Sequence, residues 1–378
     1  MPTAFVTGGS GFIGGALIER LHAEGWDVRA LARSQAAEQK VRERGAVPVP
    51  GDLENEGLMR EGATGADVAF HAAAKVEDWG DPDEFERLNV RGTANVIAAC
   101  RAAGVRRLVH VGTEAALMAG DPLVNVDETA PLRPDSPALY SSSKAKAEQL
   151  VRAANGDGLE TVVIRPRFVW GRGDTTLMPA LVELVRSGRF RWVGGGGQLS
   201  ATTHVDNTVE GLWLGATKAE PGSVYFVTDG EPVVFREFVS RLLETQGVTP
   251  PTGSVPTPVA RVAAGAAERL WRLLRRSGSP PLTRFGVWVS VSDASERTIL
   301  QVWDDPDCSR HGPFFGWLRS RLRPYPDTLN LKASLRLRDD IAPAIDLEPT
   351  DHPLAVEQRC GISVARVAEI AETLMSHR

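Results

Sequence analysis

A glycine-rich turn between an apolar strand and an apolar helix is the feature that most restricts the fold of this chain. Residues 3–14 read TAFVTGGSGFIG, with three glycines spaced three residues apart. One glycine permits the tight strand-to-helix turn, one lets the backbone approach a pyrophosphate, and one lets the helix pack close to the strand. A glycine turn can also be purely structural, but here the strand and the helix are both present, so we predict dinucleotide binding. The expected contacts are Gly8, Gly11, Phe12, Ile13 and Gly14.

Short β-rich apolar runs alternate with helical patterns along the first half of the chain, which is typical of βαβ units and of a parallel sheet buried on both faces. We expect strands near residues 3–7, 27–32, 46–49, 67–71, 107–111, 161–165 and 223–228. Helices are expected near 12–24, 36–43, 55–61, 84–103, 138–154 and 177–187. The predicted fold class is therefore α/β, a doubly wound parallel Rossmann sheet with a smaller α+β substrate lobe.

The composition and the regularity of the strand–helix pattern change along the chain, which suggests a division into domains. Residues 1–175 are expected to form the dinucleotide-binding Rossmann domain, to which 200–228 return. Residues 176–199 and 229–290 are expected to form the substrate lobe. Residues 291–378 are a divergent tail, with an amphipathic helix expected near 363–375. Three explanations stay open for 291–360: an insertion, an unrelated appendage, or a reading-frame artefact.

The composition argues against several classes of protein. The 378 residues include 43 basic and 48 acidic side chains, so a net charge of −5 supplies no positive field that would attract nucleic acid. Cys100, Cys308 and Cys360 are far apart and odd in number, which favours neither a disulfide framework nor a CxxC metal site. The sequence has no signal-peptide pattern and no apolar run long enough to span a membrane. We therefore expect a cytoplasmic protein without an integral membrane segment.

The end of the second predicted strand decides between NAD and NADP. An acidic residue there would accept a hydrogen bond from a free ribose 2′-hydroxyl, whereas an arginine would meet a 2′-phosphate. The segment reads DVRALARS, with Arg33 and no acid at the strand end. NADP is therefore favoured over NAD, although an arginine can also be solvated or stack on adenine. Asp52, in PGDL, is either a contact of the adenine amino group or a turn residue before the next helix.

A tyrosine and a lysine four residues apart form the second chemical signal. Tyr140 and Lys144, in YSSSK, project from the same face of a predicted helix. A phenol is a poor base at neutral pH, but a neighbouring ammonium stabilises the phenolate and lowers the pKa of the phenol. The pair can also be an ordinary surface pair. Because it follows a nucleotide-binding turn and five strands, we predict that it transfers a proton.

Seven segments together carry a family resemblance over about 1–290. They are TGGSGFIG at the start, HAAAK at 71–75, LNVRGTANV at 88–96, HVGTEAA at 110–116, YSSSK at 140–144, RPRFVWGRGD at 165–174 and THVDN at 203–207. In this order they resemble an extended short-chain dehydrogenase/reductase. Within that superfamily, HVGTEAA, THVDN and RLWRLLRRSGSPPLTRF are most similar to the 3β-hydroxysteroid dehydrogenase and dihydroflavonol reductase branch.

The resemblance implies a catalytic set of Thr113, Tyr140 and Lys144. The family often has two adjacent hydroxyl residues after the fifth strand, whereas here Gly112 takes one of the two positions. Thr113 would hold the substrate oxygen, although threonine is also a natural residue at a strand end. Tyr140 would pass the proton, while Lys144 would lower its pKa and hold the nicotinamide ribose. By analogy, Asn89 would orient the lysine through water.

The same resemblance implies further cofactor contacts and argues against a metal. Leu53, Ala72, Pro166 and Phe168 fall at cofactor-contacting positions, the last two beside the nicotinamide. In THVDN, His204 and Asp206 match a structural segment of the family, and neither has a second ligand at metal-binding spacing. We therefore expect no metal site.

The predicted reaction interconverts a secondary alcohol and a ketone on a small hydrophobic, steroid-like substrate. The lobe contains many aromatic residues and no evident basic cluster for a sugar-nucleotide diphosphate. A helix near 259–276 mixes leucines and tryptophan with arginines, which is compatible with peripheral contact to an anionic membrane or with a solvated surface helix. Family members often form homodimers, and that option stays open.

Two other functions stay open at this point. One is a nucleotide-sugar epimerase or dehydratase, in which the same oxidation is transient and NAD is recycled. The other is a non-catalytic NADP-sensing or scaffold protein that keeps the dinucleotide fold. The intact Tyr140 and Lys144 argue against the second alternative.

Overall fold

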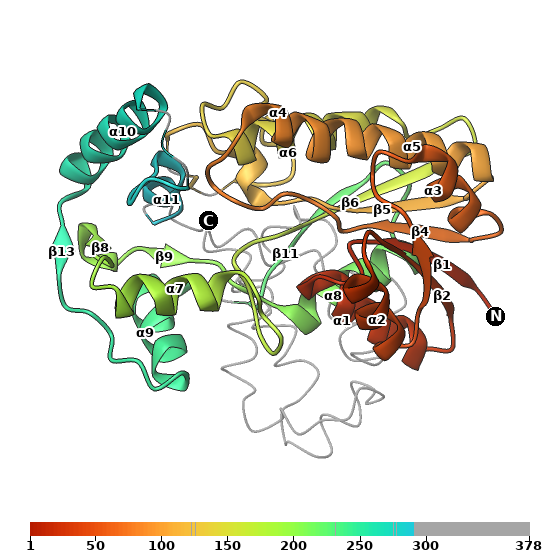
Figure 1. The fold of residues 1–378 in the computed structure, drawn as a ribbon, viewed down its shortest axis with the longest axis horizontal. Coiled ribbons are helices and arrows are strands. Elements are labelled where there is room, and N and C mark those ends of the chain that lie inside the picture. The colour runs from red at the N-terminus through yellow and green to blue at the C-terminus, as the bar shows by residue number, and fades with distance from the viewer. Residues whose placement is uncertain (122, 125, 231, 275, 277, 291–378) are drawn as a thin grey trace, which may run out of the picture. The chain divides into compact units, whose positions relative to one another are not determined.

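A seven-stranded parallel sheet forms the centre of the molecule (Figure 1). The computed structural model describes residues 1–290 apart from 122, 125, 231, 275 and 277. The strand order is β11-β6-β5-β4-β1-β2-β3, and every neighbouring pair is parallel. The strands are β1 (Thr3–Thr7), β2 (Asp27–Ala32), β3 (Val47–Pro50), β4 (Val68–His71), β5 (Arg107–Val111), β6 (Glu160–Pro166) and β11 (Val224–Val227). The predicted doubly wound Rossmann fold is confirmed.

Helices cover both faces of this sheet because each parallel neighbour needs a crossover connection. On one face lie α1 (Phe12–Ala23), α2 (Gln35–Glu43) and α8 (Val205–Thr217); on the other lie α3 (Glu56–Ala63), α5 (Gly92–Ala103) and α6 (Leu139–Ala153) (Figure 1). The side chains of Ser34 and Asn55 cap the first turns of α2 and α3. The chain reverses its direction along the sheet between β1 and β4, where open α/β sheets bind their ligands.

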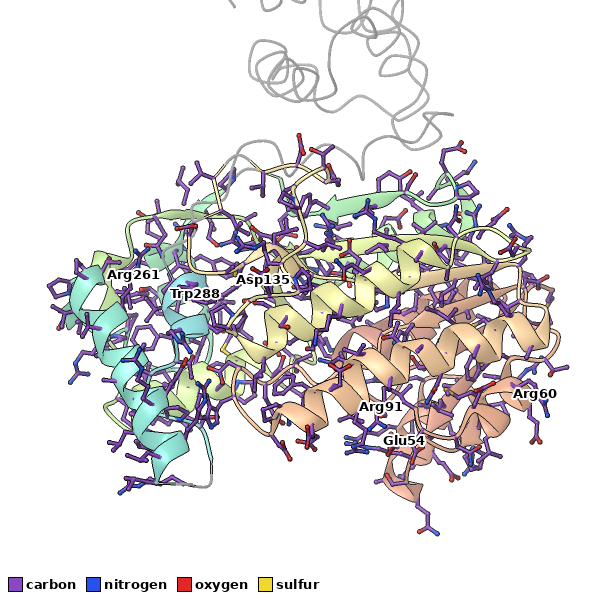
Figure 2. The ribbon with its side chains drawn as sticks, turned by 90° about the horizontal axis from the view of Figure 1, so that it is seen from above. Glu54, Arg60, Arg91, Asp135, Arg261 and Trp288 are labelled. Carbon is purple, nitrogen blue, oxygen red and sulfur yellow. The ribbon has the colours of Figure 1, made fainter. Side chains whose placement is uncertain are left out.

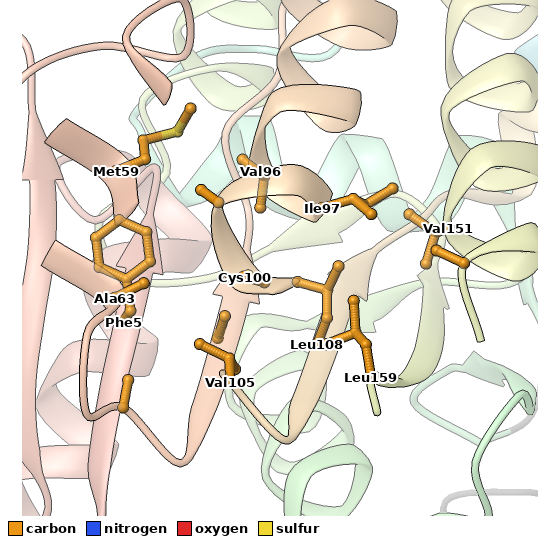
Figure 3. Close-up of a cluster of buried hydrophobic side chains, with 14 of the residues drawn as sticks. Phe5, Met59, Ala63, Val96, Ile97, Cys100, Val105, Leu108, Val151 and Leu159 are labelled. Carbon is orange, nitrogen blue, oxygen red and sulfur yellow. The ribbon is translucent and has the colours of Figure 1, made fainter. Parts of the chain in front are cut away.

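The core between the sheet and the second helix layer is apolar. Figure 3 shows Phe5 and Leu108 from the sheet packed beside Met59 and Cys100 from the helices. These side chains are almost fully buried. Burial in apolar surroundings raises the pKa of the Cys100 thiol to about 12, so this free cysteine is a core residue and not a reactive one.

The helix predicted near 84–103 is interrupted. It begins as the short α4 (Pro82–Phe85), passes through a π-helical turn over Glu86–Arg91, and continues as α5. Such turns insert one extra residue and occur frequently at functional sites. The side chain of Asn89, within the π-helical turn, is buried against the start of α6.

A smaller α+β unit follows β6. Its helices are α7 (Leu177–Arg186), α9 (Phe235–Thr245), α10 (Thr257–Leu273) and α11 (Arg284–Val289). Short ladders pair β7 (Val169–Trp170) with β10 (Thr203–His204), β8 (Trp192–Val193) with β13 (Ser254–Val255), and β9 (Leu199–Ser200) with β12 (Val233–Val234). None of the described helices is long and apolar enough to cross a membrane. The helix expected near 363–375 lies outside the described residues.

Candidate active site

The glycine turn has the geometry that a phosphate-binding turn needs. Gly8 has φ +78°, and a Cβ atom there would lie 2.6 Å from the backbone nitrogen of Ala73 and 2.7 Å from the carbonyl carbon of Ala72. A Cβ atom on Gly14 would lie 2.3 Å from the carbonyl oxygen of Gly8. The turn therefore requires glycine at both positions, and it brings Gly8 against Ala72, which the sequence also assigned to the cofactor.

Helix α1 opens from this turn with its backbone N–H groups available. The backbone N–H of Gly11, its N-cap residue, donates to the carbonyl of Gly8 at 2.9 Å, and no side chain caps the helix. The first N–H groups of a helix, here at Phe12 and Ile13, have no acceptor within the helix and carry its positive dipole end. The residues present therefore fit the pyrophosphate of a dinucleotide.

An arginine that the sequence reasoning missed supports this turn. Arg44, at the end of α2, donates from Nη1 to the carbonyl oxygens of Gly9 at 3.2 Å and Gly11 at 2.8 Å. A Cβ atom on Gly15 would fall 1.1 Å from the same nitrogen. The second glycine of the pair Gly14-Gly15 is the only sequence signal of this contact, because it makes room for the guanidinium.

The other predicted cofactor contacts near the adenine end differ in their surroundings. Arg33 is exposed directly after β2 and precedes the Ser34 cap of α2. The Asp52 carboxylate accepts the backbone N–H of Glu54 at 2.9 Å, which is the turn role that the sequence left open. The side chain of Leu53 is buried in the apolar core, and its carbonyl accepts a hydrogen bond from Asn95 Nδ2 at 2.8 Å.

Thr113, Tyr140 and Lys144 come together where β5 and α6 meet. Thr113 lies two residues after the end of β5, and its hydroxyl accepts a hydrogen bond from the backbone N–H of Ala115 at 3.2 Å. The phenol of Tyr140 lies near enough to this hydroxyl for it to favour the phenolate. Tyr140 lies in the first turn of α6 and Lys144 one turn later, with the lysine almost fully buried. Gly112 precedes Thr113 because a Cβ atom there would lie 2.8 Å from Cγ1 of Val163.

Burial shifts the pKa values of both titratable members of this set. Burial raises the pKa of Tyr140 above its usual value, and the hydrogen bond with Thr113 opposes that shift. Burial lowers the pKa of Lys144 to about 8, and the negative charge of Glu148 opposes that shift. The Lys144 ammonium donates to the carbonyl of Val111 at 2.7 Å, and the expectation that it lowers the pKa of the phenol stays a prediction.

Two buried histidines lie behind the lysine, and the sequence reasoning did not use them. His110 Nε2 lies 3.4 Å from Lys144 Nζ, and the ring of His71 lies 5.1 Å from that of His110. His71 in turn hydrogen-bonds the hydroxyls of Thr7 and Thr93 at 2.7 and 2.9 Å. Burial and the charge of Lys144 lower the pKa of both histidines, His71 to about 3, so both rings are neutral at physiological pH.

Asn89 fixes the loop after β4 to α6. Its Oδ1 accepts the backbone N–H of Lys75 at 2.7 Å, while its Nδ2 donates to the carbonyl of Lys75 and to the hydroxyl of Ser143, both at 3.0 Å. Ser143 immediately precedes Lys144. The role that analogy gave to Asn89, orienting the lysine through water, stays a prediction.

The segment after β6 has an unusual backbone. Pro166 ends β6, and Phe168 has φ +49°, a region that non-glycine residues rarely adopt. The ring of Phe168 packs edge-to-face on Phe235 at 5.4 Å and on Phe238 at 6.0 Å. This packing from α9 offsets the strain, and strained residues of this kind cluster at ligand sites.

An apolar cluster surrounds the phenol. Tyr140 packs edge-to-face on Phe285 of α11, with the ring centroids 5.6 Å apart. Trp288, labelled in Figure 2, lies on the same short helix and packs with Leu117 and Met118 from the segment after β5. The surroundings of the phenol are therefore apolar.

Comparisons with known proteins identify the family of the chain. The model of the 3-beta hydroxysteroid dehydrogenase/isomerase family matches residues 5–257. A ketoreductase of Stigmatella aurantiaca, named for 4-hydroxy-2-methyl-3-oxo-4-farnesyl-3,4-dihydroquinoline-1-oxide, is 49% identical over 301 residues, 78% of this chain and 90% of that protein. The 2-alkyl-3-oxoalkanoate reductase of Stenotrophomonas maltophilia (strain K279a) is 41% identical over 288 residues, 74% of this chain and 86% of that protein.

One solved structure and a second family model complete the comparison. The structure of MoeE5 in complex with UDP-glucose and NAD is similar with a TM-score of 0.56 and 28% identity, over 67% of this chain and 85% of that one. A model described as an uncharacterized protein conserved in bacteria (DUF2199) matches residues 277–362, which lie mostly in the tail.

The family match and the geometry point the same way. The matched range, 5–257, includes the glycine turn, the set around Tyr140 and the strained segment after β6. The resemblance to the 3β-hydroxysteroid dehydrogenase branch is confirmed by this match and by the two ketone reductases. The chain therefore belongs to the 3-beta hydroxysteroid dehydrogenase/isomerase family and is an NAD(P)-dependent dehydrogenase/reductase.

Proposed function

We propose that this protein reduces a ketone on a hydrophobic substrate to a secondary alcohol, with NADPH as the preferred reductant. The observation that carries the proposal is the placement of the Tyr140 phenol beside Thr113, edge-to-face on Phe285 within an apolar cluster, and one helical turn from the buried Lys144. Two relatives support the direction and the substrate class, since their names describe reductases of a farnesyl-bearing ketone and of a 2-alkyl-3-oxoalkanoate.

The chain's own residues perform the proton transfer in this proposal. Bound reduced nicotinamide supplies the hydride. Thr113 and Tyr140 donate hydrogen bonds to the substrate carbonyl oxygen, and Tyr140 transfers its proton to that oxygen. Burial keeps the phenol protonated, which suits an acid that must donate. Lys144 stabilises the phenolate that remains, since its ammonium lies one turn along the same helix.

A direct assay tests this function. Purified full-length protein is mixed with NADPH and a panel of ketones that carry alkyl, isoprenoid or steroid substituents, and nicotinamide absorbance is followed. We expect a net loss of NADPH and a stoichiometric secondary alcohol with the apolar ketones. Tightly bound NAD that copurifies, with sugar-nucleotide turnover and no net change in absorbance, would indicate an epimerase or dehydratase instead.

Replacing Arg33 by alanine should change the cofactor preference. Losing charge-assisted hydrogen bonds to the 2′-phosphate should raise the Kd of NADPH by about 10- to 100-fold, while the Kd of NADH stays within about twofold. Titration of each cofactor by fluorescence measures both constants. Arg60→Ala is the control, because Arg60 is exposed on α3 (Figure 2). Equal affinities of the wild type for NADH and NADPH would overturn the NADP assignment.

Helix α10 has an exposed surface that suits an anionic membrane. Val259, Val262, Leu270 and Leu273 are 56%, 74%, 47% and 79% exposed and recur at helical spacing on one stripe. A second stripe carries exposed arginines, namely Arg261, which Figure 2 labels, together with Arg269 and Arg272. An apolar stripe beside a basic one favours lipid headgroups and acyl chains as the occupant, and a membrane would also hold the apolar substrate.

Vesicle sedimentation tests this contact. Full-length protein should bind phosphatidylcholine vesicles that contain phosphatidylglycerol, and salt should weaken the binding. The double variant Val262→Ser/Leu273→Ser should bind about 10-fold more weakly, since it removes apolar area from the interface. Leu199→Ser, at an exposed leucine of β9, should bind like the wild type. Unchanged binding of the α10 variant would contradict the assignment.

A further inference from the structure

Arg44 connects the end of one helix to the glycine turn that opens another. It is the C-cap residue of α2, and its Nη1 donates to the carbonyl oxygens of Gly9 at 3.2 Å and Gly11 at 2.8 Å. Its Nε lies 3.6 Å from the carboxylate of Glu19, whose side chain is 64% exposed. Ion pairs with exposed carboxylates contribute little, so the two turn carbonyls are the stronger contacts of this guanidinium.

The space for the guanidinium exists because residue 15 has no side chain. A Cβ atom on Gly15 would lie 1.1 Å from Arg44 Nη1 and 2.0 Å from Arg44 Cζ, and the three nearest atoms all belong to Arg44. The guanidinium therefore fills the place where most helix residues carry their Cβ atom. Glycine inside a helix is less stable than alanine, and the contact with Arg44 explains why this helix has one here.

The two hydrogen bonds also fix the direction of N–H groups in the turn. A trans peptide is planar, so a carbonyl oxygen and the N–H of the next residue point in opposite directions. The bond to the carbonyl of Gly9 therefore orients the N–H of Ser10, and the bond to the carbonyl of Gly11 orients the N–H of Phe12. The N–H of Phe12 is one of the groups at the start of α1 that fit a pyrophosphate.

A turn with several glycines needs such a restraint before it binds an anion. Glycine loses more conformational freedom than any other residue when its backbone is ordered, and this turn contains Gly8, Gly9 and Gly11. A turn that is already ordered spends less of the binding free energy on ordering. The charge of Arg44 also offsets the partial negative charges of the two carbonyl oxygens, which repel a phosphate.

We propose that Arg44 is a positioning residue for the cofactor pyrophosphate and that it sets the affinity for NAD and NADP alike. Both dinucleotides contain this pyrophosphate, whereas only NADP carries the 2′-phosphate assigned to Arg33. Cofactor affinity and cofactor choice therefore depend on two different arginines, one at each end of α2. The inference concerns the cofactor and does not depend on the proposed ketone substrate.

Replacing Arg44 by methionine tests this role. Methionine keeps an apolar stem but has no donors, so the Kd of NADH and that of NADPH should both rise about 10-fold, with their ratio within about twofold of the wild-type ratio. ADP-ribose, which has the pyrophosphate but no nicotinamide, should lose affinity by the same factor. Fluorescence titration of the full-length protein measures the two cofactors, and competition measures ADP-ribose. Unchanged affinities, a loss confined to NADPH, or a loss that spares ADP-ribose would overturn the proposal.

Gly15→Ala tests the same contact with Arg44 left in the chain. The new Cβ atom displaces the end of the flexible arginine side chain, while alanine itself favours the helix. Both cofactors should again bind about 10-fold more weakly, and the double variant Gly15→Ala/Arg44→Met should bind no more weakly than Arg44→Met. Additive losses, or wild-type affinity of Gly15→Ala, would contradict the proposal. If Arg44→Met does not fold, Gly15→Ala alone decides.

Arg20→Met is the matched control. The side chain of Arg20, on α1, is 26% exposed, as is that of Arg44. Arg20 forms ion pairs with Glu24 and Glu210 and does not contact the turn. Urea unfolding without cofactor measures how far each variant is destabilised. A rise in Kd that is confined to Arg44→Met supports the positioning role, whereas equal rises in both variants would show a general effect of stability and overturn it.

Discussion

Tyr140→Phe should lower kcat by about 100- to 10,000-fold and leave the Kd of NADPH within about twofold. Removing the hydroxyl removes the proton donor, and positioned proton transfer contributes about 100- to 10,000-fold to rate. The phenylalanine ring keeps the edge-to-face contact with Phe285, so the fold around α6 should not change. Single-turnover reduction of an apolar ketone measures the rate, and fluorescence titration measures cofactor affinity.

Tyr225→Phe controls for the loss of a tyrosine hydroxyl. Tyr225 is half-buried in β11 of the same sheet, so this variant should keep wild-type turnover. A Tyr140→Phe protein that retains turnover would remove the basis of the enzymatic assignment, because Thr113 alone would then suffice. Loss of NADPH binding together with turnover would instead indicate a role for the phenol in shaping the cofactor site.

Local sequence patterns were sufficient to predict the sheet and its crossovers. Strands such as β1 and β5 are short, apolar and bounded by turn residues, and each helix between them has an apolar face, so the pattern specifies both elements and order. The two-residue ladders of the lobe carry no such pattern. Pairs such as Trp192–Val193 with Ser254–Val255 form between segments far apart in sequence, and only tertiary packing specifies them.

The site likewise contains some features that local sequence spacing predicts and others that it does not. The glycine turn and the pair Tyr140 and Lys144 are local spacings, so the sequence contains them directly. The contacts of Arg44 with the turn and of Glu114 with Arg167 join residues 33 or more positions apart, and no periodicity indicates them. The protonation of Tyr140 depends on burial, which spacing does not specify.

A separate family model covers part of the C-terminal tail. Residues 277–362 match a family model of their own, and the three explanations for 291–360 stay open. The matched range begins before α11, so it includes the helix that places Phe285 on the Tyr140 phenol.

The second large effect concerns stability. Glu148→Leu should lower the free energy of unfolding by about 3–5 kcal/mol, because it leaves the Arg165 guanidinium buried without its counter-ion. Glu148 and Arg165 are both 0% exposed, so water cannot replace the lost partner. Urea unfolding followed by tryptophan fluorescence measures the change. The double variant Glu148→Leu/Arg165→Leu should recover a large part of the loss, since it removes both buried charges.

An exposed ion pair gives the comparison that isolates burial as the cause. Glu86 and Lys146 approach to 3.2 Å while their side chains are 47% and 44% exposed, so Glu86→Gln should change the free energy of unfolding by less than about 1 kcal/mol. Equal effects of Glu148→Leu and Glu86→Gln would contradict the argument. The Glu148 variant also removes the negative charge that raises the pKa of Lys144, so activity should be lost at a lower pH on the alkaline side than in the wild type. The lysine is charged only below its pKa, so a lower pKa moves the alkaline limit of activity to lower pH. Such a shift would show that the charge of Glu148 influences the proton transfer at Tyr140 through Lys144.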